Sequence, residues 1–234
     1  MPERIAVSNR AAAQWRRAVL VGIRRETPRV STFRFAVPDR QEHLPGQHLM
    51  LRLTAEDGYT AQRHYSIASP PEDAGHLELT LDHVAGGEVS GHLHTVARVG
   101  DEFEVRGPLS GFFAWPGDRP ALLLGAGTGV VPLMSMLRHR RVRGLDVPLR
   151  LLVSARTRAE LPYAAEYGAE TTAVLTREGE GRRLSADHLA SCFAAGAPEW
   201  EAYVCGSNAF AEHASRLLVA LGQPVDRIRI ERFG

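Results

Sequence analysis

A glycine-rich segment in the second half of the chain, Gly125–Pro132 (GAGTGVVP), carries the residue types of a phosphate-binding turn. It follows the apolar residues Ala121–Leu124 and opens a predicted helix. Glycines let a backbone approach a ligand closely, and the free N–H groups at a helix start attract a pyrophosphate. Val130 stands where a strict G-x-G-x-x-G pattern would have its third glycine. The segment predicts a dinucleotide site, and the alternative is a plain glycine-rich turn of an α/β sheet.

The residues after the next apolar stretch, Leu149–Val153, indicate which dinucleotide the site would take. An NAD site usually has Asp or Glu there to hold the ribose 2′-OH, whereas hydroxyl and guanidinium groups suit the 2′-phosphate of NADP. This chain has serine, threonine and arginine where two apolar stretches end, and Arg182 and Arg183 add positive charge. The alternative for any single arginine is a solvated surface position. The predicted ligands of the 2′-phosphate are Ser154, Arg156, Arg158, Thr176 and Arg177.

A second segment that could bind a ligand lies in the first half of the chain, at Arg63–Ser69 (RHYSIAS). An arginine can pair with a phosphate through two hydrogen bonds. Tyr65, two residues after Arg63, points to the same side of a strand and can lay its ring on a flat heterocycle. Ser66 offers a donor to a ring nitrogen. The alternative for this segment is an ordinary amphipathic strand.

A third segment, Gly86–Thr95 (GGEVSGHLHT), places two glycines before a short helix with Ser90 near its start. Free N–H groups there form a second nest that suits a phosphate, and the alternative is a crossover turn with a capped helix. His92 and His94 are two residues apart on this helix, so they face different ways and cannot share a metal ion. No metal site is predicted.

These segments require two kinds of structure to position them. The first half alternates apolar and polar residues in short runs separated by turns, which predicts six antiparallel strands that form a small barrel. The second half alternates apolar strands with helices, which predicts an α/β domain with a parallel sheet. The boundary falls in the Gly/Pro-rich segment Trp115–Pro120, giving domains of residues 1–116 and 117–234. One of the predicted helices of the second half is Ala159–Tyr167.

The composition excludes several classes of protein. A net charge of +1 over 234 residues argues against a nucleic-acid binder that relies on overall charge and against a polybasic membrane anchor. Two cysteines, Cys192 and Cys205, cannot form a disulfide scaffold or supply four ligands to an iron–sulfur cluster. The first residues lack an apolar signal segment, so we expect a cytoplasmic protein. The uncharged run Pro120–Leu137 has three glycines and Pro132 in its middle, which favours a strand, turn and helix over a membrane span.

In this order and spacing, the segments resemble the motifs of the ferredoxin–NADP reductase superfamily, from about Trp15 to Gly234. RHYSIAS resembles the flavin motif R-x-Y-S-x-x-S, with His64 in place of the usual residue after the arginine. GGEVSGHLHT is similar to the pyrophosphate-binding segment, and GAGTGVVP to the nicotinamide-nucleotide loop. The other similar segments are GPLSGFF (Gly107–Phe113), YVCGSN (Tyr203–Asn208) and IERFG (Ile230–Gly234).

The resemblance implies that the barrel binds a flavin and that the α/β domain binds NAD(P). The arginine of the first motif would hold a flavin phosphate, the tyrosine would stack on the isoalloxazine, and the serine would lie near N5. The backbone after the fifth strand would pass beside the ribityl or adenosine portion, and the glycine-rich helix start would bind the pyrophosphate, which favours FAD over FMN. The implied flavin-binding residues are Arg63, His64, Tyr65, Ser66, His83, Val84, Gly87, Val89 and Ser90.

On the nucleotide side, the resemblance implies that the glycine-rich loop takes the nicotinamide nucleotide. The Cys-Gly pair would lie by the nicotinamide, and the C-terminal aromatic residue would cover the flavin face that the nicotinamide must reach. The alternatives are a small core residue for the cysteine and a packed tail for the aromatic residue. The implied nucleotide-side residues are Gly127, Thr128, Gly129, Cys205, Gly206 and Phe233, and the expected catalytic residues are Tyr65, Ser66, Cys205 and Phe233.

The expected function is therefore an FAD-dependent NAD(P)H reductase, in which hydride passes from NADPH to flavin N5. A flavin accepts two electrons together and releases them singly, so we expect a separate one-electron acceptor, a ferredoxin or an iron–sulfur oxygenase component. Two alternatives stay open at this point. One is an NADH-preferring flavin reductase, and the other is a non-catalytic flavin- or nucleotide-binding subunit of a larger electron-transfer complex.

Overall fold

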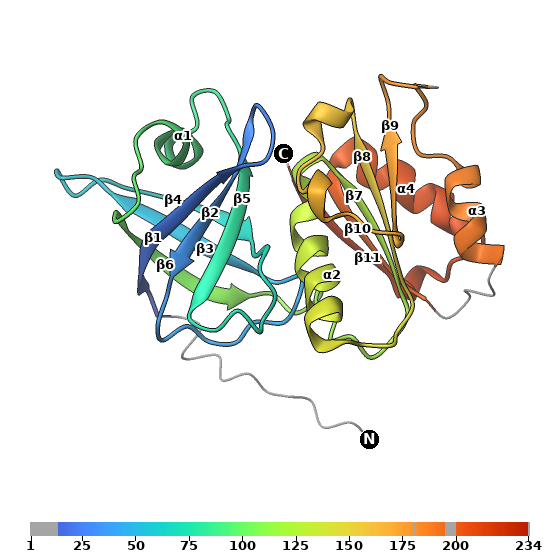
Figure 1. The fold of residues 1–234 in the computed structure, drawn as a ribbon, viewed down its shortest axis with the longest axis horizontal. Coiled ribbons are helices and arrows are strands. Elements are labelled where there is room, and N and C mark those ends of the chain that lie inside the picture. Colours follow the sequence, from blue (N-terminus) through green and yellow to red (C-terminus); the bar gives the residue numbers. More distant parts are fainter. Residues whose placement is uncertain (1–13, 180, 195–199, 234) are drawn as a thin grey trace.

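The structure is a computed structural model that describes residues 14–179, 181–194 and 200–233. Two lobes lie side by side, a β-barrel built by the first half of the chain and a layered α/β lobe built by the second (Figure 1). The architecture confirms the predicted fold class. In the described ranges, no helix is long and apolar enough to cross a membrane. Residues 1–13 and Gly234, which the expected domain limits and the last motif include, lie outside the described residues.

The barrel is a six-stranded antiparallel sheet with the order β4-β3-β6-β1-β2-β5. An isolated antiparallel bridge between Ile67 and Leu79 joins its two end strands. Alternate residues point inward, as in β3, where Leu49 and Leu51 are buried in the barrel core. The helix α1 (Glu88–Thr95) packs its Val89 and Leu93 into this core. The strands are β1 (Arg16–Arg25), β2 (Val30–Ala36), β3 (His48–Thr54), β4 (Thr60–Ser66), β5 (His76–Asp82) and β6 (Glu102–Leu109).

The second lobe contains a five-stranded parallel sheet with the order β11-β10-β7-β8-β9. From β7 the chain adds β8 and β9 toward one edge of the sheet. It then returns to the other side of β7 and adds β10 and β11 toward the opposite edge. The order therefore reverses between β7 and β10, and ligands of open α/β sheets bind beside the carboxyl ends of strands at such a switch point. The strands are β7 (Ala121–Ala126), β8 (Leu149–Ala155), β9 (Thr171–Leu175), β10 (Glu201–Ser207) and β11 (Ile228–Phe233).

Helices cover both faces of this sheet, which explains why its strands are apolar almost throughout. Leu123 faces the helix α2 (Val131–Arg143), whereas its neighbours in β7 belong to the cluster under α3 (Ala186–Ala194) and α4 (Asn208–Ala220). A 3-10 turn, Gly127–Val130, connects β7 to α2. The first two turns of α2 are fully buried, because this helix lies at the seam between the sheet and the barrel (Figure 1).

The two lobes share one apolar cluster and a group of buried ion pairs. Ala68 and Phe113 from the barrel half belong to the same cluster as the buried residues of α2. Arg138 of α2 binds Glu78 of β5 at 2.9 Å and Glu166 at 2.5 Å, and it also donates to the Ala68 carbonyl. The seam is thus a packed interface with charge pairs at its edge.

The predicted helix Ala159–Tyr167 is wrong. The structure has two separate 3-10 turns there, Arg158–Glu160 and Ala164–Glu166. Pro162 has no N–H to continue a helix, and Tyr163 adopts a left-handed conformation with φ of 59°. This bend buries Tyr163, whose hydroxyl donates to Thr80 Oγ1 of β5 at 2.5 Å. The segment therefore contributes to the seam between the lobes.

Candidate functional site

A cavity of about 390 Å³ opens on the barrel beside β4, β5 and α1, and we call it the barrel cavity. Nine of the residues that the sequence predicted on the flavin side or at the C-terminus line it, although their segments lie far apart in the chain. Thr80, Leu81, Asp82, Glu88, Thr128 and Val131 line it as well. The nine predicted residues are Arg63, His64, Tyr65, Ser66, Val84, Gly87, Val89, Ser90 and Phe233.

The wall of the barrel cavity combines an aromatic ring, a buried hydroxyl and a paired arginine. Tyr65 packs against the barrel core, and burial raises the pKa of its phenol to about 12, so it stays neutral. Ser66, next along β4, is buried. Arg63 reaches across the cavity to Glu88, with Nη2 and Oε2 3.2 Å apart, and Tyr59 donates to the same carboxylate at 2.7 Å. Glu88 thus holds the guanidinium at the mouth of the cavity.

The start of α1 forms a close-fitting part of this cavity. Gly87 is the residue before the helix and has no side chain that could cap the first N–H groups. A Cβ at Gly87 would collide with Ser90 Oγ and lie 3.1 Å from the Val84 carbonyl oxygen. The bare backbone therefore leaves uncapped N–H groups beside the cavity, and such groups favour a phosphate.

A second cavity, of about 500 Å³, lies beside the carboxyl ends of β7, β8 and β10, and we call it the sheet cavity. This is the switch point of the parallel sheet. The barrel closes one side of the cavity with Thr27, Pro28 and Arg29 from the turn between β1 and β2. The predicted residues that line it are Gly127, Thr128, Ser154, Arg156 and Thr176.

Behind the sheet cavity, the first turn after β7 packs directly on the end of β10. A Cβ at Gly129 would collide with the Cys205 carbonyl and lie 2.8 Å from Gly206 Cα, so only glycine allows this approach. Cys205 is fully buried, and burial together with the Glu231 carboxyl raises the pKa of its thiol. Glu231 pairs with Cys205 in the register of β10 and β11, and burial raises the pKa of its carboxyl to about 7.

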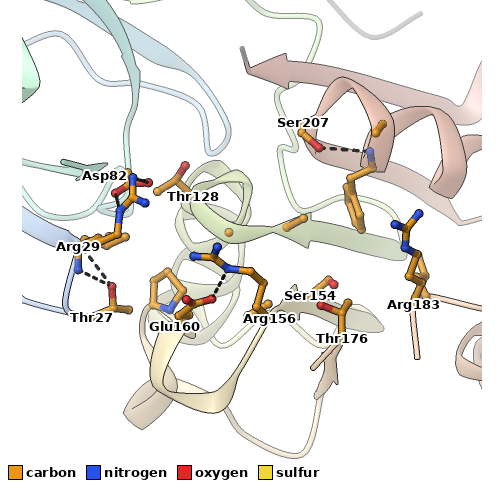
Figure 2. Close-up of a pocket in the computed structure, with 18 of the residues that line it drawn as sticks. Thr27, Arg29, Asp82, Thr128, Ser154, Arg156, Glu160, Thr176, Arg183 and Ser207 are labelled. Atoms are coloured by element: carbon orange, nitrogen blue, oxygen red, sulfur yellow. Dashed lines mark hydrogen bonds and ion pairs between the residues drawn. The ribbon is translucent and has the colours of Figure 1, made fainter. Parts of the chain in front are cut away.

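One corner of the sheet cavity gathers hydroxyl groups and charges. Hydrogen bonds from Thr176 N to Ala155 O (2.9 Å) and from Arg177 N to Arg156 O (2.8 Å) hold the ends of β8 and β9 together. Figure 2 shows Ser154 and Thr176 between the side chains of Arg156 and Arg183, which come from two different loops. Arg156 Nε donates to Glu160 Oε2 at 2.7 Å, and this bond raises the pKa of the guanidinium.

Six predicted site residues do not line either cavity. Gly129, Cys205 and Gly206 are buried behind the sheet cavity. His83 stands between two lining residues, and its carbonyl accepts from Arg29 at 3.3 Å. The side chains of Arg158 and Arg177 are exposed outside the sheet cavity, and the Arg158 backbone N–H donates to Glu178. Of the three arginines predicted to bind the 2′-phosphate, Arg156 therefore lines the sheet cavity, whereas Arg158 and Arg177 do not.

Sequence reasoning missed several residues of the site. Glu160 was placed in a helix, but the 3-10 turn Arg158–Glu160 directs its carboxylate into the cavity. Its position four residues after Arg156 predicts an ion pair between the two side chains, but it does not predict that they line a cavity. Arg29 binds Asp82 through two hydrogen bonds of 3.1 and 3.2 Å across strands 53 residues apart, a contact that local sequence does not reveal.

The two cavities adjoin. Thr128, at the start of the turn before α2, lines both of them, and so does Asp82 at the end of β5. Phe233 lines the barrel cavity from β11 and pairs in register with Ser207, which lines the sheet cavity. Each lobe therefore contributes walls to the cavity of the other lobe.

Comparison with known proteins identifies the barrel. Residues 17–114 match the family described as the oxidoreductase FAD-binding domain. The chain is 30% identical over 224 residues to the ferredoxin reductase component of 3-ketosteroid-9-alpha-monooxygenase from Mycobacterium tuberculosis, covering 89% of this chain and 62% of the relative. It is 27% identical to the reductase component of propane 2-monooxygenase from Mycolicibacterium goodii, covering 84% of this chain and 60% of that relative. The chain thus spans about 60% of the length of these curated relatives.

Solved structures share the whole two-lobed fold. A ferredoxin NADP+ reductase from Neisseria gonorrhoeae with bound FAD and NADP superposes with a TM-score of 0.79 at 20% identity, covering 94% of this chain and 99% of that chain. The FAD/NAD-binding domain of nitric oxide dioxygenase from Vibrio cholerae gives the same TM-score at 22% identity, covering 94% and 98%. Residues 17–114 thus belong to the oxidoreductase FAD-binding domain family, and the chain as a whole is similar to the ferredoxin–NADP reductase superfamily in its two-lobed fold.

Proposed function

We propose that this chain is the reductase module that passes reducing equivalents from NAD(P)H, bound in the sheet cavity, to FAD, bound in the barrel cavity, and on to a one-electron acceptor. The observation that carries the proposal is the adjacency of the two cavities, which share Thr128 and Asp82. Holding two reactants in contact converts a bimolecular step into a unimolecular one.

The residues of the barrel cavity fit FAD. A flat ring system suits the apolar and aromatic walls supplied by Tyr65, Val84 and Phe233. The pyrophosphate suits the uncapped start of α1, where Gly87 leaves the backbone bare, and Arg63 supplies a cation. When bound, FAD supplies the capacity to take up a hydride and to release its electrons one at a time.

The other residues act by positioning and by excluding water. Gly129 lets the turn before α2 pack on β10, which places Thr128 between the two ligands. Cys205 stays a neutral thiol because its pKa is raised, so we assign it a packing role beside the nicotinamide and no role as a nucleophile. Phe233 is 38% exposed, and we assign it the role of covering the flavin until the nicotinamide arrives.

For the nucleotide, we propose that NADPH is bound at the corner of the sheet cavity formed by Ser154, Arg156 and Thr176. Two hydroxyl groups and a guanidinium suit a 2′-phosphate. Arg183 lines the same corner and makes no hydrogen bond or ion pair with another described residue, so its charge is also available.

For the acceptor, we propose a separate electron-carrier protein, a ferredoxin or an iron–sulfur oxygenase component. Two of the relatives are named as reductase components of monooxygenases, which supports an acceptor within an oxygenase system. The cytoplasmic location that the sequence favours stays a prediction.

An anaerobic titration of the FAD-loaded chain tests the proposed function. We expect one equivalent of NADPH to bleach the flavin absorbance completely, and oxidised ferredoxin to restore it. NADH is titrated in parallel to rank the two nucleotides. Flavin that binds but is bleached by neither nucleotide would favour the alternative of a non-catalytic binding subunit.

A further inference from the structure

The charged and titratable side chains that line the sheet cavity belong to Arg29, Asp82, Arg156, Glu160, Arg183 and His213. At the barrel end, Arg29 and Asp82 bind each other through two hydrogen bonds. At the opposite end, the ring of His213 bonds to the Leu184 carbonyl at 2.7 Å. The other charges that line the cavity belong to Arg156 and Glu160, which pair with each other, and to Arg183, which lies on the other side of Ser154 and Thr176 (Figure 2).

Glu160 is unexpected in a phosphate-binding cavity, because its carboxylate repels the negative charge of a phosphate. Its Oε2 accepts from Arg156 Nε, and no hydrogen bond from a described residue reaches its Oε1. The side chain is 36% exposed, so the free oxygen is open to a ligand in the cavity. The Thr157 carbonyl accepts from the Glu160 backbone N–H at 3.1 Å, which fixes the turn that carries it.

The two nicotinamide dinucleotides would meet this carboxylate differently. A ribose 2′-OH, which NADH carries, can donate to a carboxylate oxygen. A 2′-phosphate has a charge of about −1.5 to −2 at neutral pH, and its dianion has no proton to donate. It is attracted by the two arginines but repelled by Glu160, which also neutralises part of the charge on Arg156.

We propose that Glu160 is a specificity-determining residue, which accepts a hydrogen bond from the ribose 2′-OH of NADH and weakens binding of the 2′-phosphate of NADPH. The cavity would then accept both nucleotides, because the two arginines favour binding of the 2′-phosphate and Glu160 disfavours it. This inference rests on the proposed function, because it assigns the sheet cavity to the adenosine end of a nicotinamide dinucleotide.

The test uses two fragments that carry the discriminating group but no nicotinamide, 2′,5′-ADP and 5′-AMP. Their binding to the FAD-loaded chain is measured by calorimetry, so the readout does not depend on flavin reduction. We expect Glu160→Gln to raise the ratio of the 5′-AMP to the 2′,5′-ADP dissociation constant by about 2- to 5-fold, the scale of partly exposed charge pairs.

Glu212→Gln is the matched control. Glu212 also pairs with an arginine four residues away, Arg216, and its loss changes the net charge by the same amount. It lies on α4 and does not line the sheet cavity. We expect the ratio of dissociation constants in this variant to equal that of the unaltered chain.

Three outcomes separate the inference from the proposed function. A higher ratio in Glu160→Gln alone supports the role of Glu160. An unchanged ratio in Glu160→Gln, with both fragments binding the unaltered chain, overturns that role and leaves the nucleotide site in place. Failure of both fragments to bind the unaltered chain overturns the nucleotide site itself, and with it the proposed function.

Discussion

At the scale of single residues, two arginines expected to bind phosphates are each paired with a carboxylate in a cavity. Arg63 binds Glu88 in the barrel cavity, and Arg156 binds Glu160 in the sheet cavity. Both pairs are partly exposed, so each contributes little to stability by itself. A phosphate can therefore pair with the arginine beside the carboxylate, or in its place, at a small cost in free energy.

Arg63→Ala is expected to weaken FAD binding. A charge-assisted hydrogen bond to phosphate contributes about 1.5–3 kcal/mol, so the dissociation constant of FAD should rise about 10- to 100-fold. Titration of the flavin-free chain, followed by flavin fluorescence, measures the change. Arg17→Ala, which removes an exposed arginine paired with Glu102 on the barrel wall, is the control. Unchanged FAD affinity in Arg63→Ala would remove this residue from the site.

Arg156→Ala is expected to discriminate between the two nucleotides. Loss of the guanidinium removes the partner of a 2′-phosphate and leaves the Glu160 charge uncompensated, so the KM for NADPH should rise about 10-fold or more. The KM for NADH should change much less, because NADH lacks the 2′-phosphate. Steady-state reduction of an artificial acceptor gives both values, with Arg216→Ala as the control. Equal increases for the two nucleotides would contradict the assignment of this corner.

At the scale of elements, the carboxyl ends of β10 and β11 place a thiol and a carboxyl side by side in a buried position. The register pairs Cys205 with Glu231, and the pKa values of both groups are raised. The side chains of Cys205 and Glu231 are therefore both uncharged at low pH. Such an environment suits an uncharged ring more than a phosphate.

Glu231→Gln is expected to alter the pH dependence of stability. The carboxyl has an ordinary pKa of 4.5 and a folded-state pKa of about 7, so the folded chain binds more protons between these values. The free energy of unfolding of the parent should therefore fall as pH rises from about 4.5 to 7. We expect this fall to exceed that of the variant by about 2–3 kcal/mol. Urea unfolding of both chains at pH 5 and pH 8 measures this difference. An equal change with pH in the two chains would contradict the raised pKa.

The elements themselves could largely be predicted from the sequence, because their apolar patterns are local. The apolar residues Ala121–Leu124 lie in β7, and the helix expected after the glycine-rich turn is α2. The helix predicted across Pro162 was wrong, because the proline and the left-handed Tyr163 bend the chain toward the barrel. Glu160 could not be assigned for the same reason, since its position in the cavity depends on that bend. Contacts such as Arg29 with Asp82 depend on how distant strands pair, which local patterns do not encode.

At the scale of the whole molecule, the relative position of the two lobes decides whether their cavities meet. α2 lies between them, and its Arg138 is bound by Glu78 of the barrel and by Glu166 of the bent segment. The Tyr163 hydroxyl bonds to Thr80, a residue that also lines the barrel cavity. The seam thus connects the wall of one cavity to the segment that carries Glu160.

Arg138→Met is expected to destabilise this seam. Glu78 is nearly buried and would keep only Arg34 as a charged partner, so the free energy of unfolding should fall by about 2 kcal/mol. Urea unfolding at neutral pH measures the change. Arg216→Met, at an exposed ion pair on α4, should leave the free energy within about 0.5 kcal/mol of the parent. Equal stability of the two variants would show that the pairs at the seam contribute little.

The most direct measurement of the central claim is a crystal structure of the chain with FAD and a nicotinamide dinucleotide analogue that cannot release hydride. The account predicts the isoalloxazine in the barrel cavity against Tyr65, and the nicotinamide reaching it past Thr128 from the sheet cavity. A flavin bound outside the barrel cavity, or a nucleotide whose nicotinamide does not reach the flavin, would contradict it.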